Sequence, residues 1–167
     1  VLKKTNRSEW AAPNFAIPKS DGTIRFLTDF RELNKRIKRK PYPIPKIQDL
    51  LFKLEGFKWA TSLYLNMGYY HIHLNPFNKS LCTIVLPWGK YEYQRLPMGL
   101  CNSPDIFQEN MSELMMDLEH VRAYIDDLLV FTSGSYEDHL SKVSQVLHRL
   151  KAVGLKVNAT KSFFARY

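Results

Sequence analysis

The stretch 122–132, RAYIDDLLVFT, places two aspartates, Asp126 and Asp127, side by side between two apolar runs. The runs are short and rich in residues that favour strands, which predicts a tight β-hairpin with the acids at or near its tip. A solvated turn is one explanation, because Asp is a favoured turn residue. Two-residue hairpin turns usually contain glycine, however, and this segment contains none. The pair therefore calls for a chemical explanation beside the structural one.

Adjacent carboxylates repel each other and raise each other's pKa unless a cation lies beside them. Mg²⁺ prefers oxygen ligands and is the natural counterion. Because successive strand residues point to opposite faces of a sheet, one aspartate can be a full ligand while its neighbour is secondary. Two magnesium ions that catalyse phosphoryl transfer need at least one more carboxylate from another strand. The hairpin thus predicts metal ligands at Asp126 and Asp127 and requires a third acid elsewhere.

Outside the hairpin, extended and helical patterns alternate along the chain. Extended segments are predicted at 20–30, as a hairpin whose second arm carries Arg25 and Asp29, at 58–65, and at 81–96 with a turn at 87–90. Helices are predicted at 47–56, from Ser103 onward, and from Ser135 to a stop at Gly154. The proline-rich segment 35–46 is expected to be an exposed loop. This order predicts an α+β domain with helices against one face of an antiparallel sheet.

The two later helices each carry an apolar stripe, which is expected to face the core. The first stripe consists of Phe107, Met111, Leu114, Met115 and Leu118. The second consists of Leu140, Val143, Val146, Leu147, Leu150 and Val153.

Length and composition indicate one globular domain with two lobes, since 45% of the 167 residues are apolar. The two cysteines, Cys82 and Cys101, are too few for a disulfide framework. No stretch has the length and apolar purity of a signal peptide or membrane span, so we expect an intracellular protein, cytoplasmic or nuclear, without a membrane partner.

The net charge of +8 is unevenly distributed. Residues 1–58 hold 14 Lys and Arg against 6 Asp and Glu, whereas residues 59–167 hold 10 of each kind. Such asymmetry is typical of a protein in which one lobe binds a polyphosphate backbone. A solubilising face is the alternative.

Five motifs in order give the chain a strong resemblance to the reverse transcriptases of gypsy-type LTR retrotransposons. They are SEWAAPNFAIPKSDGTIRFLTDFRELNKRIKRKPYPIPKIQDLL, TSLYLNMGYYHIHL, LPMGLCNSPDIFQENM, YIDDLLVF and GLKVNATKSFF. The resemblance implies a single domain over 1–167 with the right-hand polymerase arrangement and a ferredoxin-like palm. Fingers are expected near 1–40 and 72–102 and palm near 41–71 and 103–167. Because the chain stops at Tyr167, thumb, connection and RNase H segments are expected to be absent.

The resemblance also assigns roles to individual residues. Lys19 and Arg25 look like the fingers residues that hold the triphosphate of an incoming dNTP, and Lys161 resembles a palm lysine near that triphosphate. Tyr69 looks like the bulky residue that excludes a ribose 2′-hydroxyl. Met98 and Gly99 look like the loop beneath nucleotide and template. The implied partners are an RNA or DNA template-primer and dNTP with Mg²⁺, and the basic residues expected on nucleic acid are Lys35, Arg36, Lys38, Arg39 and Lys40.

The chain differs from the family pattern at the position of the third metal-binding carboxylate. The family strand reads Leu-Asp-Leu, whereas this chain reads SLYL, so Tyr64 stands at the aspartate position and no carboxylate lies between Leu63 and Leu74. A phenol with a pKa near 10 is neutral at pH 7 and a poor magnesium ligand. We therefore expect little or no polymerisation. No spacing supports rescue by Glu55 or Glu92.

Three origins of Tyr64 stay open: decay of a mobile element, a deliberate inactivating mutation, or retention of the domain for a task without catalysis. Two alternatives to an impaired polymerase follow, namely a nucleic-acid-binding module and a protein-interaction module. The histidines show no metal-ligand spacing, and residues 71 and 73 are interpreted as part of a half-exposed strand. They are His71, His73, His120, His139 and His148.

Overall fold

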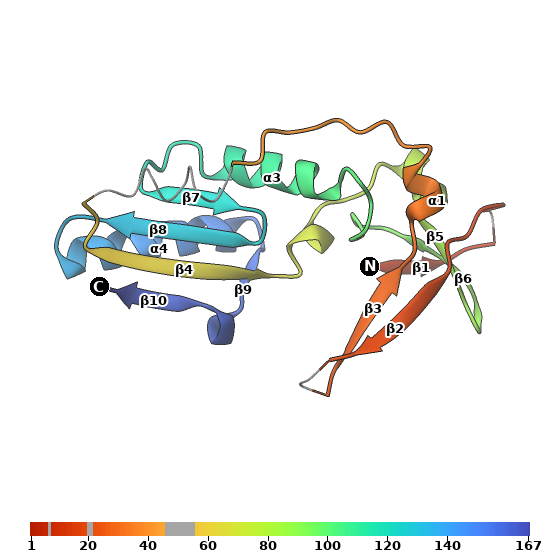
Figure 1. The fold of residues 1–167 in the computed structure, drawn as a ribbon, viewed down its shortest axis with the longest axis horizontal. Helices are drawn as coiled ribbons and strands as arrows, with labels where there is room; N and C mark the ends of the chain where they lie inside the picture. Colours follow the sequence, from red (N-terminus) through yellow and green to blue (C-terminus); the bar gives the residue numbers. More distant parts are fainter. Residues whose placement is uncertain (7, 20–21, 46–55) are drawn as a thin grey trace. The chain divides into compact units, whose positions relative to one another are not determined.

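The structure is a computed structural model of residues 1–167 and describes all of them except 7, 20–21 and 46–55 (Figure 1). The chain forms two compact units, each built from two separate stretches of sequence. The first unit consists of Val1–Lys40 and Tyr69–Ser103, and the second of Pro41–Gly68 and Pro104–Tyr167. Each unit is described by itself below.

The second unit is built on an antiparallel sheet with the strand order β10-β4-β8-β7. Its strands are β4 (Trp59–Asn66), β7 (Val121–Tyr124), β8 (Asp127–Thr132) and β10 (Phe163–Arg166), and the short β9 (Lys156–Val157) pairs with the end of β4. Every second residue of the two central strands is buried, as expected of a sheet with one covered face. The predicted strand at 58–65 and the predicted hairpin at 121–131 are both confirmed.

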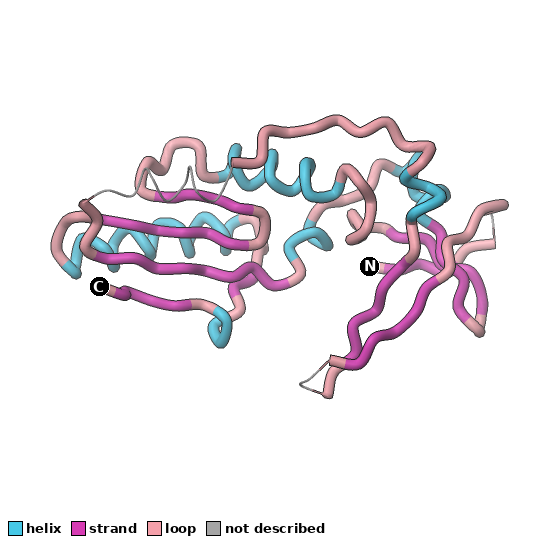
Figure 2. Tube along the Cα trace, in the orientation of Figure 1, coloured by secondary structure: helices cyan, strands magenta, loops and turns pink. Residues whose placement is uncertain are grey.

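Helix α4 (Tyr136–Ala152) packs across β4, β8 and β10, as Figures 1 and 2 show. Its start is fixed by Ser135, whose hydroxyl accepts a hydrogen bond from the Asp138 amide, and Gly154 follows its end with a φ of 78°. Both boundaries were predicted from the sequence.

The buried stripe of α4 corrects one prediction. Its members are His139, Val143, Val146 and Leu150, whereas Leu140 and Val153 are 45% and 48% exposed. The spacing of four, three and four residues places His139 on the inner face, and Leu140 lies about 100° further around the helix. His139 is fully buried because both ring nitrogens are hydrogen-bonded, to Thr61 Oγ1 at 2.8 Å and Thr132 Oγ1 at 2.9 Å.

Helix α3 (Ser103–Leu114) runs along the β7 side of the sheet (Figure 1). It begins at Ser103 as predicted, and its buried residues include Phe107 and Met111. The helix ends at Leu114, so Met115, which is buried, and Leu118, which is half-buried, lie in the turns that follow. The predicted stripe therefore continues past the helix itself.

The first unit contains a three-stranded antiparallel sheet, a separate hairpin and a single turn of helix. The sheet has the order β1-β6-β5, from β1 (Leu2–Lys4), β5 (Thr83–Leu86) and β6 (Gly89–Tyr93), and the hairpin joins β2 (Asn14–Pro18) to β3 (Ile24–Thr28). Helix α1 (Arg31–Asn34) and the 3₁₀ helix η2 (Pro76–Cys82) complete it. The 3₁₀ helix η1 (Gly68–His71) begins at the last residue of the second unit's first stretch and continues into the first unit, and η3 (Ala159–Lys161) belongs to the second unit. Its core includes Ala12, Phe30, Ile84 and Leu96.

The predicted hairpins at 20–30 and 81–96 are confirmed, although the tip residues 20–21 lie outside the described residues and β6 already begins at Gly89. Residues 35–45 form no helix or strand and are mostly exposed, as predicted. The predicted helix at 47–56 falls almost wholly outside the described residues. His71 lies in η1, and residue 73 makes only an isolated bridge to Arg95, so the predicted strand there is wrong.

Antiparallel sheets with packed helices confirm the predicted α+β class. No described helix combines the length and apolar character needed to cross a bilayer.

Candidate functional site

The tip of the β7–β8 hairpin carries the two aspartates. Tyr124 pairs with Asp127, so the turn itself consists of Ile125 and Asp126. Ile125 has a φ of 49°, in the left-handed region where two-residue hairpin turns normally place glycine or asparagine. A β-branched residue is strained there, by about 1–3 kcal/mol. The turn therefore holds a conformation that its own sequence disfavours.

The Asp126 carboxyl is half-buried, and its Oδ1 atom is buried without a hydrogen-bond partner among the described residues. Burial raises the pKa of Asp126 to about 6, and the neighbouring Asp127 charge adds to the rise. Burial also raises the pKa of Asp127, although that side chain is more exposed. A carboxylate with a raised pKa and an unpartnered oxygen has the character of a ligand or acid–base site.

Tyr64 lies directly opposite Asp127 in the β4–β8 ladder. The Lys161 ammonium lies over the Tyr64 ring, with Nζ 4.8 Å from the ring centroid. Such a cation–π contact keeps the amine beside the phenol. The second unit therefore brings together four residues singled out in the sequence, namely Tyr64, Asp126, Asp127 and Lys161.

The donor set at this hairpin does not fit a site for two divalent ions. Within the described part of the chain, no group of three or more His, Cys, Asp or Glu side chains is placed to hold a metal ion. Asp126 and Asp127 are the two carboxylates that the hairpin supplies, and the residue opposite Asp127 is a tyrosine.

The remaining predicted nucleotide-binding residues belong to the first unit. Lys19 and Arg25 lie on the β2–β3 hairpin with exposed side chains. Met98 and Gly99 are exposed in a turn, where Gly99 has a φ of 96° and its carbonyl accepts a 2.8 Å hydrogen bond from Asn34 Nδ2. Tyr69, in η1, is 8% exposed.

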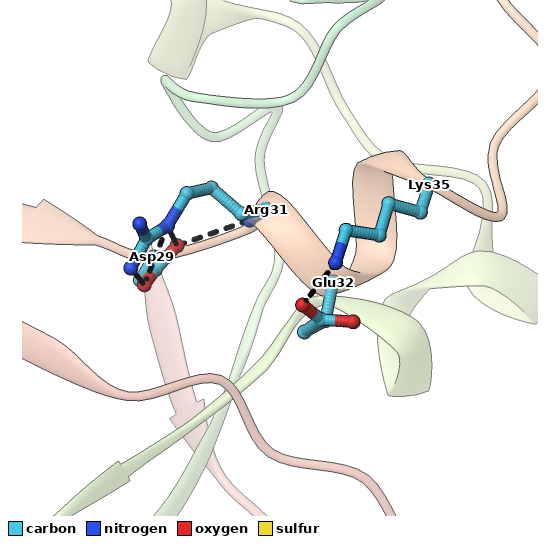
Figure 3. Close-up of polar contacts among 4 residues, drawn as sticks. All are labelled: Asp29, Arg31, Glu32 and Lys35. Carbon is cyan, nitrogen blue, oxygen red and sulfur yellow. Dashed lines mark hydrogen bonds and ion pairs between the residues drawn. The ribbon is translucent and has the colours of Figure 1, made fainter.

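Several residues of the basic loop, residues 35–40, make polar contacts, and Figure 3 shows the one between Lys35 and Glu32. Lys35 pairs with Glu32 at 2.6 Å, and the Arg36 guanidinium lies 5.6 Å from the Trp10 ring centroid. Asn102 holds the following residues: its Oδ1 accepts from the Lys40 amide at 3.2 Å and its Nδ2 donates to the Lys38 carbonyl at 3.2 Å.

Two groups of residues here were missed by sequence reasoning. Arg31 makes a bidentate contact with Asp29 and lowers the pKa of that carboxyl to about 2, while its own side chain is 85% exposed (Figure 3). Their spacing of two residues is a weak sequence signal. Asn102 and Gln108 bind backbone groups far along the chain; both lie in the motif LPMGLCNSPDIFQENM, which assigned them no role.

Comparison with known proteins agrees on one family. Residues 17–166 match the model described as reverse transcriptase (RNA-dependent DNA polymerase). The chain is 38% identical over 144 residues to the enzymatic polyprotein of Cestrum yellow leaf curling virus, covering 85% of this chain and 22% of that protein. It is 33% identical over 156 residues to the transposon Tf2-3 polyprotein of Schizosaccharomyces pombe, covering 92% of this chain and 12% of that protein.

A solved structure, the foamy viral protease-reverse transcriptase dRH in complex with double-stranded DNA, superposes with a TM-score of 0.93 at 25% identity. The likeness covers 100% of this chain and 29% of that one, and it confirms the predicted fold. The chain spans less than a quarter of the length of the two polyproteins.

Proposed function

This chain belongs to the reverse transcriptase (RNA-dependent DNA polymerase) family, and on that premise we propose that it is a gypsy-type retrotransposon polymerase domain whose catalysis is lost or strongly impaired. The observation that carries the proposal is Tyr64, which lies opposite Asp127 at the position where the family's third metal acid is expected. Its ring is engaged with Lys161 and offers no negative charge.

In this proposal the first unit corresponds to fingers, near 1–40 and 72–102, and the second to palm, near 41–71 and 103–167. The compact units of the structure support that division. Lys19 and Arg25 are the proposed triphosphate contacts, Tyr69 the proposed sugar-selecting residue, and Met98 with Gly99 the loop beneath nucleotide and template.

Impairment is expected because the site offers too little negative charge to divalent ions. Divalent ions, when bound in such enzymes, neutralise charge on the attacking and leaving oxygens of a phosphoryl group. Here Asp126 and Asp127 are the carboxylates available, and the raised pKa of Asp126, about 6, weakens the charge it offers below neutral pH. Loss of one ligand of this kind is expected to cost several kcal/mol of transition-state stabilisation, at about tenfold in rate for each 1.4 kcal/mol.

Primer extension by the parent chain and by Tyr64→Asp tests the proposal. We expect the extension rate of Tyr64→Asp to exceed that of the parent by at least about 100-fold, which corresponds to about 2.7 kcal/mol in the activation free energy. Tyr64→Asn is the matched control, because it removes the ring without restoring the charge, and it should stay inactive. Extension by the parent at a rate similar to Tyr64→Asp would refute impairment at this position.

A metal readout makes the test independent of other polymerase segments. Mn²⁺ titration followed by electron paramagnetic resonance should show weak binding in the parent and tighter binding in Tyr64→Asp. Equal affinity in the two proteins would remove Tyr64 as the cause.

The second candidate function is binding without chemistry. It is favoured by the exposed basic loop, which Asn102 holds in place through two backbone contacts, and its basic residues are Lys35, Arg36, Lys38, Arg39 and Lys40. Binding of single-stranded nucleic acid through these residues should weaken with salt, by about 0.7 log units in affinity per log unit of salt for each phosphate contacted. A flat salt profile would contradict it.

A protein-interaction module is the remaining alternative. The strand β10 exposes Phe163 and Phe164 by 56% and 48%, and Tyr167 beyond it by 91%. Apolar surface of this kind favours contacts with other proteins. Elution as a monomer at high concentration, with no partner retained, would count against this function.

A further inference from the structure

Gln108 on α3 is almost fully buried, and its side-chain amide is bonded to the backbone of the aspartate hairpin. Its Nε2 donates to the Ala123 carbonyl at 3.0 Å, and its Oε1 accepts from the Ile125 amide at 2.7 Å. A third contact runs from Nε2 to Ser112 Oγ at 3.2 Å, within α3 itself. One amide side chain therefore offers β7 the same donor and acceptor that a neighbouring strand would offer.

The position of β7 explains why such a partner matters. β7 is the last strand in the order β10-β4-β8-β7, so among the described residues one of its edges has no strand to pair with. Backbone groups removed from water without a partner cost about 1–3 kcal/mol each. Gln108 supplies hydrogen-bond partners to two half-buried backbone groups, on the two sides of Tyr124.

The same amide contacts the strained residue of the turn. Ile125 adopts a φ of 49°, which an isoleucine does not hold without support from its surroundings. Gln108 binds the Ile125 amide on the α3 side, and on the β4 side the Leu65 amide donates to the Asp126 carbonyl at 2.8 Å. The two hydrogen bonds therefore hold two successive residues of the turn, Ile125 from α3 and Asp126 from β4.

We propose that Gln108 is a positioning residue, whose side-chain amide keeps the turn at Ile125 in its left-handed conformation and thereby holds the Asp126 carboxyl in its half-buried place. The inference does not depend on whether the domain polymerises, because it concerns the geometry of the hairpin alone. It gives a part in the site to a residue of α3 to which the motif LPMGLCNSPDIFQENM assigned no role.

The test uses Gln108→Met, which keeps the length and apolar stem of the side chain but removes both hydrogen bonds. The readout is the φ of Ile125 and the exposure of the Asp126 side chain in crystal structures of the parent and the variant. In the parent we expect Ile125 in the left-handed region, at a φ near 49°, and in Gln108→Met we expect a negative φ with the Asp126 side chain exposed to solvent. An unchanged Ile125 φ and a still half-buried Asp126 in a folded Gln108→Met protein would overturn the proposal.

Two variants separate positioning from general loosening. Ser112→Ala removes only the contact within α3 and should leave the Ile125 φ and the Asp126 exposure unchanged. Met111→Ala opens a cavity under the same helix and should lower stability without changing the turn. If Met111→Ala changes the turn as much as Gln108→Met does, Gln108 has no specific role.

Hydrogen exchange on the parent protein keeps the proposal testable even if Gln108→Met fails to fold. The Ile125 amide lies at the tip of a two-residue turn and should be protected only because Gln108 Oε1 accepts its proton. Exchange at the rate of an unstructured peptide would overturn the proposal, and protection comparable to the neighbouring strand amides would support it.

Discussion

Two carboxyl groups, Asp29 in the first unit and Asp126 in the second, are held in opposite ways. Asp29 lies beside the exposed Arg31 guanidinium, which lowers its pKa to about 2, and cations such as Lys19 and Arg25 in the same unit are exposed. Asp126 lies half-buried at a strained turn, and burial raises its pKa to about 6. The exposed charges of the first unit are therefore screened by salt, whereas Asp126 is a partly desolvated group whose properties depend on single neighbours.

This contrast predicts that the second unit tolerates small changes poorly, and Gly68→Ala should show the largest effect. A Cβ at Gly68 would lie 2.4 Å from Phe107 Cζ, in a ring that is 1% exposed and cannot move away. We expect a loss of about 1–3 kcal/mol in the free energy of unfolding, measured with urea. Gly134→Ala is the control, because its new Cβ would meet the flexible Asp138 side chain, and its effect should be well under 1 kcal/mol.

The buried His139 should make the second unit sensitive to acid. Burial lowers the pKa of His139, so the folded protein binds this proton less readily than the unfolded chain does, whose histidine titrates near 6.5. Its contribution to stability is therefore complete above about pH 6.5 and is lost as the pH falls toward the folded pKa, by up to about 1.4 kcal/mol per pH unit. Urea unfolding of the parent and of His139→Leu between pH 7.5 and 5 should show a steeper loss in the parent. Parallel profiles would contradict the assignment.

The contribution of Asp126 to the free energy of unfolding should change with pH in the opposite direction. Its folded pKa is raised, so ionisation opposes folding and the penalty grows as the pH rises from about 3.8 through about 6. Asp126→Asn should therefore raise the free energy of unfolding at pH 7.5 by about 1 kcal/mol, below the full value of the shift because the carboxyl is partly solvated. Asp127→Asn, at the more exposed neighbour, should gain less. A loss of stability in Asp126→Asn would mean that the carboxylate has a partner in solution.

The smallest effects are expected in the first unit. Replacing Lys38 and Lys40 by alanine should weaken nucleic-acid binding and reduce the salt slope by about 1.4 in total if each contacts one phosphate. Thermal unfolding should hardly change, because both side chains are exposed. A pronounced drop in melting temperature would show that the basic loop is structural, and the contrast between the units would fail.

The sequence predicted most of the fold because hydrophobic period and helix-capping signals are local. Both ends of α4 were visible from Ser135 and Gly154, and the aspartate hairpin from its two apolar arms. The buried face of α4 was misjudged at His139 and Leu140, since the threonine on β4 that makes burial of the imidazole favourable, Thr61, lies 78 residues away in the chain.

The candidate site was only partly accessible from the sequence. Asp126 and Asp127 are marked by their own chemistry, whereas the role proposed for Tyr64 rests on the resemblance to the family. The positive φ of Ile125 and the Gln108 amide bonds depend on how α3 and β7 pack, and no spacing rule in the sequence encodes them. The pairing of Lys161 with the Tyr64 ring likewise arises only once η3 is folded against β4.

The backbone around Tyr64 has one evolutionary consequence. Its amide donates to Ser162 Oγ at 3.0 Å, its carbonyl accepts from the Asn158 amide at 2.8 Å, and its ladder partner is Asp127. The two hydrogen bonds and the strand pairing involve only backbone atoms of Tyr64, so another residue can stand there without loss of the strand. The position is thus free to vary while selection on folding leaves the surrounding scaffold intact.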